Sequence, residues 1–127
     1  MKEIINTKNA PAPIGPYNQA VKASNTLYIS GQIPLIPSTM ELYSGTIKEE
    51  TELVMQSLNS ILEEAGMNFE NVVKTTIFID DMKNFQYVNE VYGKYFQNEN
   101  APARETVAVK TLPKSVRIEI SMIAVSF

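Results

Sequence analysis

The sequence has no cysteine and no histidine among its 127 residues. Without cysteine the chain has no disulfides, no thiolate nucleophile and no cysteine-based zinc site. Without histidine it lacks the commonest general base and the commonest metal ligand. Any catalysis must therefore use carboxylates, tyrosine, lysine or arginine side chains, bound water or a cofactor.

Long apolar runs are also absent, and no stretch approaches the roughly 18 residues needed to span a bilayer. The N-terminus shows no apolar core of a signal peptide, so we expect a cytoplasmic protein with no membrane partner.

Basic residues are scattered in a chain of net charge −3. They offer no stripe that would attract a phosphate backbone, so nucleic acid is a poor candidate partner. A small anionic ligand held by one local arginine remains open.

The composition that is present, 44% hydrophobic and 20% charged residues, is that of an ordinary globular protein. The chain is long enough for a real hydrophobic core. No linker, internal repeat or low-complexity segment divides it. We therefore expect one domain spanning residues 1–127.

Alternation and short apolar runs predict six strands. They are expected at residues 2–5, 19–22, 26–30, 72–80, 102–109 and 116–122. The second and third form a hairpin, Gly31 is expected to end the third, and the last two read as adjacent strands around a proline-containing turn. In the last strand, Ile118 and Ile120 should face one side of the sheet and Glu119 the other.

Two helices are predicted between these strands. Thr46 and Glu49 fit a capping box, an apolar stripe follows at helical spacing, and Gly66 supplies a left-handed stop. The second helix is expected from Met82 or Asn84 to Phe96, with Asp81 as a candidate N-cap. Its buried face is expected to contain Phe85, Val88, Tyr92, Tyr95 and Phe96.

The resulting order β-β-β-α-β-α-β-β predicts an α+β fold with a mixed sheet of about six strands. Two helices, each with one apolar stripe, can cover only one face of such a sheet. The residues of the other face are mixed polar and apolar rather than fully charged. We therefore predict a homo-oligomer in which a second subunit covers that face.

Two charged residues lie in the last two predicted strands. Arg104 follows Pro102-Ala103, and Glu119 is central in an otherwise apolar run. Because isolated buried charges are costly, we hypothesise that the two side chains share one polar pocket. The guanidinium would clamp a carboxylate, and a partly buried carboxyl with a raised pKa would position or deprotonate a water. A solvated surface position is the alternative for each residue.

Four further residues allow either a structural or a functional interpretation. Tyr17, after Ile14-Gly15-Pro16, could anchor a loop on the core or offer its hydroxyl to a small ligand. Ser30 and Gly31 could mark a plain strand end or a place where backbone amides approach a ligand. Asn89, at the margin of the second helix's apolar face, could be an exposed polar residue or a ligand contact.

Taken together, the motifs resemble the RidA/YjgF family of reactive intermediate deaminases over nearly the whole chain, from about Ile4 to Val125. The segments that carry the resemblance, in family order and spacing, are Ile14-Gly15-Pro16-Tyr17, Leu27-Tyr28-Ile29-Ser30-Gly31-Gln32-Ile33-Pro34, Val73-Lys74-Thr75-Thr76-Ile77-Phe78, Val88-Asn89, Pro102-Ala103-Arg104, Leu112-Pro113-Lys114 and Ile118-Glu119-Ile120. The Ser-Gly-Gln-Ile-Pro and Pro-Ala-Arg segments are the most specific.

The resemblance implies a chorismate-mutase-like fold that assembles as a homotrimer with clefts between subunits. It implies hydrolysis of 2-iminobutanoate and 2-iminopropanoate, the enamine/imine products of PLP-dependent threonine and serine dehydratases, to 2-oxo acids and ammonia. It also implies that the reaction needs no metal and no cofactor, which agrees with a chain lacking histidine and cysteine.

The resemblance further implies roles for single residues. Arg104 would hold the substrate carboxylate, and Glu119 would handle the attacking water. The residues that would line the pocket are Tyr17, Ser30, Gly31, Asn89 and Thr106. Of these, the Tyr17 hydroxyl is counted among the catalytic groups. Thr106 stands where some members have cysteine and would contribute mainly its backbone.

The sequence departs from the family pattern at a few positions, which bear on pocket shape and substrate range. Ser121 replaces a frequent second glutamate, and Met40 stands where a turn glycine is usual. Glu105 follows the arginine where a small residue is common. It could partly neutralise Arg104 if it turned inward, but neighbours in a strand point to opposite faces.

Two rival functions remain. In the first, the same cleft senses a small carboxylate without turnover, and the trimer regulates a partner protein. In the second, the chain cleaves RNA or inhibits translation, roles attached to some relatives. The net negative charge of the chain and the lack of a basic patch in the sequence argue against a function on RNA.

Overall fold

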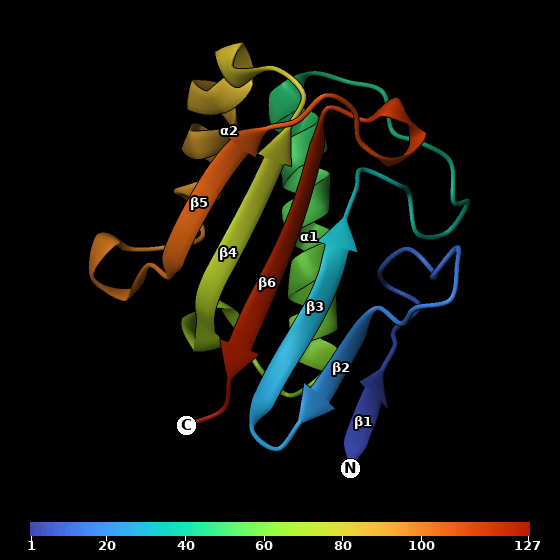
Figure 1. Ribbon diagram of the computed structural model, residues 1–127, viewed down its shortest axis with the longest axis vertical. Helices are drawn as coiled ribbons and strands as arrows, with labels where there is room; N and C mark the ends of the chain where they lie inside the picture. Colours follow the sequence, from blue (N-terminus) through green and yellow to red (C-terminus); the bar gives the residue numbers. More distant parts are fainter.

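The structure is a computed structural model that describes residues 1–127. It confirms the α+β class: six strands form one mixed sheet, and both helices cover the same face of it (Figure 1). In chain order the elements are β1 (Lys2–Ile5), β2 (Ala20–Ala23), β3 (Thr26–Gln32), α1 (Ile47–Glu64), β4 (Val72–Ile79), α2 (Phe85–Tyr92), β5 (Ala103–Ala108) and β6 (Ile118–Val125).

The strand order across the sheet is β1-β2-β3-β6-β4-β5. Only β4 and β5 run parallel, because the chain crosses over through α2 between them; the other pairs are antiparallel. The prediction that the last two strands are adjacent is therefore wrong. The last strand, β6, enters the middle of the sheet, and β4 separates it from β5.

Helix α1 forms as the sequence predicts. The Thr46 side chain accepts a hydrogen bond from the Glu49 amide at 3.1 Å, and the Glu49 carboxylate accepts one from the Thr46 amide at 2.9 Å. The helix ends before Gly66, whose φ of 74° is the left-handed conformation that glycine adopts without strain. These signals are local, so the sequence alone is enough to place both ends of the helix.

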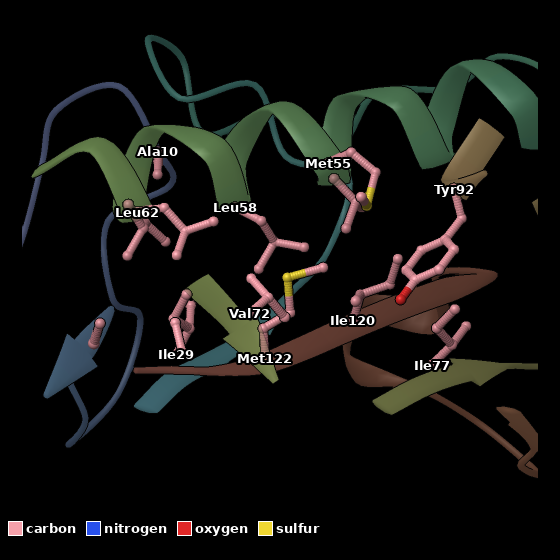
Figure 2. Close-up of a cluster of buried hydrophobic side chains, with 14 of the residues drawn as sticks. Ala10, Ile29, Met55, Leu58, Leu62, Val72, Ile77, Tyr92, Ile120 and Met122 are labelled. Atoms are coloured by element: carbon pink, nitrogen blue, oxygen red, sulfur yellow. The ribbon is translucent and has the colours of Figure 1, made fainter. Parts of the chain in front are cut away.

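The hydrophobic core lies between α1 and the sheet (Figure 2). Strand β6 alternates as predicted: Ile118, Ile120 and Met122 are buried beneath the helices, while Glu119 lies on the opposite face. Figure 2 shows Leu58 of α1 pointing toward the sheet, near Met122 of β6. Burial of such apolar surface is the main favourable term in folding, so the helix layer is fixed firmly on this face.

Helix α2 is shorter than predicted. A 3-10 turn at Met82–Asn84 precedes it, Asp81 caps that turn by accepting from the Lys83 amide, and the α-helix ends at Tyr92 instead of Phe96. Two prediction errors follow. Tyr95 and Phe96 lie beyond the helix, partly buried against the core. Phe85, expected in the buried face, is 36% exposed at the start of α2.

The N-terminal hairpin is confirmed, with β2 shifted by one residue to Ala20–Ala23. Its turn contains Ser24, at a positive φ of 56°. Strand β3 continues through Gly31 to Gln32, so the prediction that Gly31 ends the strand is wrong. Instead, the pairing of β3 with β6 shifts register between Ile29 and Gln32, and Gly31 lies within that irregularity.

We call the side of the sheet away from the helices the open face. Cross-strand register places Tyr28, Phe78, Val107, Glu119 and Ile123 on it. Tyr28 and Val107 are 51% and 40% exposed, which leaves apolar side chains uncovered. No helix of the protein has the length and apolar character that crossing a membrane requires.

Candidate active site

Arg104 and Glu119 lie on opposite faces of the sheet. In register, Arg104 pairs with Thr75, a fully buried residue of the helix-covered face, whereas Glu119 pairs with Phe78 on the open face. Strand β4 also separates their two strands. The hypothesis that the two side chains share a pocket is therefore wrong for a single chain. Each side chain has its own set of neighbours.

Glu119 lines a small cavity on its side of the molecule, together with Tyr17 and Gly31. The full lining is Pro11, Ala12, Ile14, Tyr17, Gln19, Gly31, Gln32, Ile33, Leu35, Pro113 and Glu119. The cavity measures about 60 Å³. Typical ligand sites measure about 300–1,000 Å³. The cavity of the single chain is thus smaller than a typical ligand site.

Gly31 makes room for the Glu119 side chain. A Cβ atom at position 31 would lie 2.7 Å from Cδ and 2.9 Å from Cγ of Glu119, closer than side-chain atoms approach one another. The carboxyl group therefore lies against the backbone of β3, at the register irregularity between Ile29 and Gln32. A glycine at this position determines where the carboxyl group can lie.

The Glu119 carboxyl has no hydrogen-bond partner and no cation within its own chain. It is partly buried, and this burial raises its pKa. A carboxyl with a raised pKa and free oxygens can accept a proton from a water molecule more readily than an ordinary surface glutamate. The general-base role of Glu119 stays a prediction, and a free carboxyl with a raised pKa is compatible with it.

Tyr17 lies at the edge of this cavity, and its role as a ligand contact stays a prediction. Its hydroxyl accepts a hydrogen bond from the Ile14 amide at 3.3 Å, which folds the ring back onto its own loop. The side chain is nevertheless 47% exposed at the rim of the Glu119 cavity. Because the hydroxyl accepts in that bond, its own proton remains available to a ligand.

Gln19 is a residue of this cavity that the sequence did not single out. It is 2% exposed, and its Nε2 donates to the carbonyls of Thr7, Ala10 and Pro11 at 2.8–3.1 Å. Its Oε1 accepts from the Thr7 amide at 2.7 Å. The sequence signal that could have indicated this role is an uncharged polar residue just after a proline-rich loop. The backbone groups of such a loop lack partners in secondary structure, and a buried side-chain amide can hydrogen-bond to them.

Ser30, predicted to line the pocket, uses its hydroxyl within the protein. It donates to the Asn18 carbonyl at 2.7 Å and so ties β3 to the segment behind Tyr17. Its side chain does not line the Glu119 cavity.

On the other face of the sheet, helix α2 holds the Arg104 side chain. Nη1 donates to Asn89 Oδ1 at 2.7 Å. The guanidinium carbon lies 4.9 Å from the ring centre of Tyr92 and 5.7 Å from that of Phe85. The structure thus brings Arg104 and Asn89 together as predicted, and it adds two aromatic neighbours.

No carboxylate neutralises Arg104. Glu105, the adjacent acid, points to the opposite face, where it accepts from Thr76 at 2.8 Å and pairs with Lys74 at 3.0 Å. The Thr76 hydrogen bond and then Lys74 lower the pKa of Glu105. The prediction that alternation keeps Glu105 away from Arg104 is confirmed.

Thr106 shares the strand face of Arg104, two residues further along β5. Its Oγ1 is buried and has no hydrogen-bond partner. We call Glu119, Tyr17 and Gly31 the carboxylate half-site, and Arg104, Asn89 and Thr106 the guanidinium half-site. No group of three or more carboxylates gathers anywhere in the chain as it would around a metal ion.

A family model described as endoribonuclease L-PSP matches residues 7–126. The 2-iminobutanoate/2-iminopropanoate deaminase of Mus musculus is 47% identical over 125 residues, which cover 98% of this chain and 92% of the mouse protein. The matched residues 7–126 therefore include the positions of both half-sites.

Solved structures agree with this similarity. One from Thermotoga maritima is 50% identical, covers 100% of this chain and 99% of its own, and superimposes with a TM-score of 0.96. The structure of E. coli TdcF with bound serine is 38% identical, covers 98% and 99% of the two chains, and has a TM-score of 0.92.

Proposed function

Since the chain belongs to the RidA/YjgF family, whose family model carries the description endoribonuclease L-PSP, we propose that it hydrolyses 2-iminobutanoate and 2-iminopropanoate. The products are the 2-oxo acids and ammonia. The observation that carries the proposal is the pair of half-sites: an arginine with no carboxylate partner and a glutamate with no cation, both in a chain nearly half identical to a named deaminase.

The two half-sites are joined by assembly. In a homotrimer, the guanidinium half-site of one subunit meets the carboxylate half-site of the next. Three features support this arrangement: the opposite faces of Arg104 and Glu119, the small cavity beside Glu119, and the uncovered apolar side chains of the open face. The ligand then lies in a cleft between subunits.

The chemistry follows from the two charges. Arg104 clamps the substrate carboxylate and so fixes the imine carbon near Glu119. Glu119 takes a proton from water as the oxygen adds to the C=N carbon. Returning that proton to nitrogen gives a carbinolamine. Glu119 then moves the proton of the new hydroxyl group to the nitrogen, so the C–N bond breaks as the C=O bond forms, which releases ammonia and leaves the 2-oxo acid. Imines already hydrolyse readily in water, so the enzyme needs only a modest rate acceleration. Orientation of the substrate and a general base that contributes about 10²–10⁴-fold to the rate are sufficient for it.

The direct test is a coupled assay in which a threonine dehydratase generates the imine and the release of 2-oxobutanoate is followed. Arg104→Ala and Glu119→Gln should each reduce the acceleration by about 10²-fold. If Arg104→Ala accelerates release as well as the unaltered protein does, the clamp assignment is wrong.

A mixing experiment tests the shared cleft. Arg104→Ala and Glu119→Gln subunits, unfolded together and refolded as a 1:1 mixture, form clefts that combine an intact Arg104 with an intact Glu119 in about one quarter of cases. Activity should therefore return to about one quarter of that of the unaltered protein. A mixture as inactive as its two components would place both residues of a working site in one chain and contradict the proposal.

The alternative is a regulatory trimer that binds a small carboxylate without turnover. The structure of E. coli TdcF with bound serine favours small-carboxylate binding as such. Calorimetric binding of 2-oxobutanoate together with unaccelerated imine decay would favour the regulatory function. RNA cleavage, which the family description suggests, is not supported by the charge of the chain, whose net value is −3 and whose basic residues are scattered along the sequence.

A further inference from the structure

Tyr92 lies beneath the Arg104 guanidinium, and the catalytic proposal gives it no role. Its ring centre is 4.9 Å from the guanidinium carbon, and the residue is 5% exposed. A guanidinium at this distance from an aromatic ring is attracted electrostatically, and more strongly where one partner is desolvated. The ring can therefore act as a platform for the cation.

The platform itself is fixed. The Tyr92 hydroxyl is hydrogen-bonded to Thr75 Oγ1 at 3.1 Å, and the ring packs against Phe96 with centres 4.7 Å apart. Thr75 is fully buried on β4 and is the register partner of Arg104 on β5. One hydroxyl pair thus connects α2 to the strand that lies beside the arginine.

Burial raises the pKa of Tyr92, although Thr75 and Arg104 act in the opposite direction. The phenol therefore stays neutral at physiological pH. Its hydroxyl remains a partner for Thr75, and its ring face remains a neutral platform for the cation. Figure 2 shows the ring extending from α2 toward the sheet.

These contacts leave one edge of the guanidinium open. The Tyr92 ring lies against the guanidinium, and Asn89 engages Nη1. Nε and Nη2 have no partner within the chain, and they form one edge of the guanidinium fork. A carboxylate can accept two parallel hydrogen bonds from such an edge.

We propose that Tyr92, tethered by Thr75, is a positioning residue that holds this open edge of Arg104 toward the substrate carboxylate. This inference rests on the proposed function, because it gives Arg104 the role of carboxylate clamp. A freely rotating arginine would have to be ordered in each binding event, whereas a stacked one is already oriented. Loss of the platform should therefore weaken binding more than it slows the chemical step.

The experiment compares Tyr92→Leu, which removes the ring, with Tyr92→Phe and Thr75→Val, which keep the ring and remove the tether. Val88→Ala is the matched control, since Val88 is also buried on α2. Tyr92→Leu should raise the KM for the imine and the Kd for 2-oxobutanoate by about 2- to 30-fold, with kcat within about 3-fold. The two tether variants should raise both constants by about 2- to 5-fold, and the control should not.

A double-mutant cycle separates positioning from general packing. In the Arg104→Ala background, Tyr92→Leu should cause no further increase in the Kd for 2-oxobutanoate. An equal increase in both backgrounds, or one no larger than that of Val88→Ala, would overturn the role of Tyr92. If the leucine variant does not fold, unchanged constants in both tether variants would overturn it instead. If Arg104→Ala alone leaves KM and Kd unchanged, the proposed clamp itself fails.

Discussion

The chain has two arginines, and their surroundings differ in kind. Arg117 is already paired: its Nε and Nη2 donate to the two oxygens of Glu50 at 3.1 and 2.8 Å, and Nη2 also donates to the Gly45 carbonyl at 2.8 Å. Arg104 has one side-chain hydrogen bond, to an amide, and two aromatic rings near its guanidinium group. The first guanidinium has a carboxylate of its own chain, and the second does not.

We call Arg117 and Glu50 the closed pair, and Arg104 and Glu119 the open pair. The closed pair ties the start of β6 to the first turn of α1, and Glu50 is buried, so removing its cation would leave a buried charge. In the open pair, each charge lacks an opposite charge within the chain. Loss of one partner of the closed pair would destabilise the fold, while an unpaired cation and an unpaired acid remain available to a ligand.

The largest effect is expected on the carboxylate side of the open pair. Gly31→Ala would bring a Cβ within 2.7 Å of Glu119 Cδ and displace the carboxyl group. We expect kcat for imine hydrolysis to fall by about 10²-fold, as for loss of a general base. The coupled dehydratase assay measures this value.

Gly15→Ala is the matched control for that change. A Cβ at position 15 meets only the Tyr17 ring, at an ordinary contact distance of 3.4 Å. Its kcat should stay within about 3-fold of the unaltered value. Equal activity of both alanine variants would show that the Glu119 carboxyl does not need the space left by Gly31.

Replacing each arginine by lysine contrasts the two pairs directly. Lysine keeps the charge but loses the planar fork. Arg104→Lys should lower kcat/KM by about 10- to 100-fold and leave the free energy of unfolding nearly unchanged, because that fork is needed only for the ligand.

Arg117→Lys should do the reverse. It loses part of the bidentate contact with Glu50, so the free energy of unfolding should fall by about 1 kcal/mol while kcat/KM changes by less than about 3-fold. Urea unfolding and the coupled assay give both quantities for both variants. A loss of stability at position 104, or a loss of activity at position 117 alone, would break the distinction between the pairs.

The smallest effect concerns the pH dependence of stability. Burial raises the pKa of Glu119 above that of an ordinary glutamate. At a pH below the ordinary value the residue is protonated in both the folded and the unfolded chain, and the fold has its full stability. That stability decreases as the pH rises through the raised pKa, because the buried carboxyl must then ionise. Glu119→Gln should therefore raise the Tm at pH 7. The increase should be on the order of 1–3 °C, because solvent screens a half-exposed carboxyl. Near pH 4 the Tm of the variant should approach that of the unaltered protein. A lower Tm for Glu119→Gln at pH 7 would mean that a cation pairs with Glu119 in the assembled protein.

Sequence reasoning succeeded where the signal was local. The capping box of Thr46 and Glu49 placed the start of α1, and alternation in β6 separated Glu119 from Ile118 and Ile120. It also placed Arg104 and Glu105 on opposite sides of β5. Each of these results depends on residues no more than a few positions apart in the sequence.

It failed where distant segments decide the outcome. The two strands that carry Arg104 and Glu119 are consecutive in the chain, yet β4 lies between them, because pairing order depends on long-range contacts. The spacing of the aromatic residues predicted a helix as far as Phe96. In the structure the Tyr95 amide donates to the Tyr92 carbonyl, three residues back and not the four of an α-helix, so the helix has already ended. The platform role of Tyr92 was missed for the same reason, since a buried helical tyrosine looks like core until its neighbours are known.

The position of β6 has a consequence for biosynthesis. Of the six strands, it is the last to leave the ribosome, yet it alone hydrogen-bonds the two parts of the sheet, β1-β2-β3 and β4-β5. Until it is translated, each part has an exposed edge with unpaired backbone groups, and such edges associate readily with other chains. The nascent polypeptide must therefore remain unassociated until β6 has been translated, and stalling before Ile118 would leave a fragment prone to aggregation.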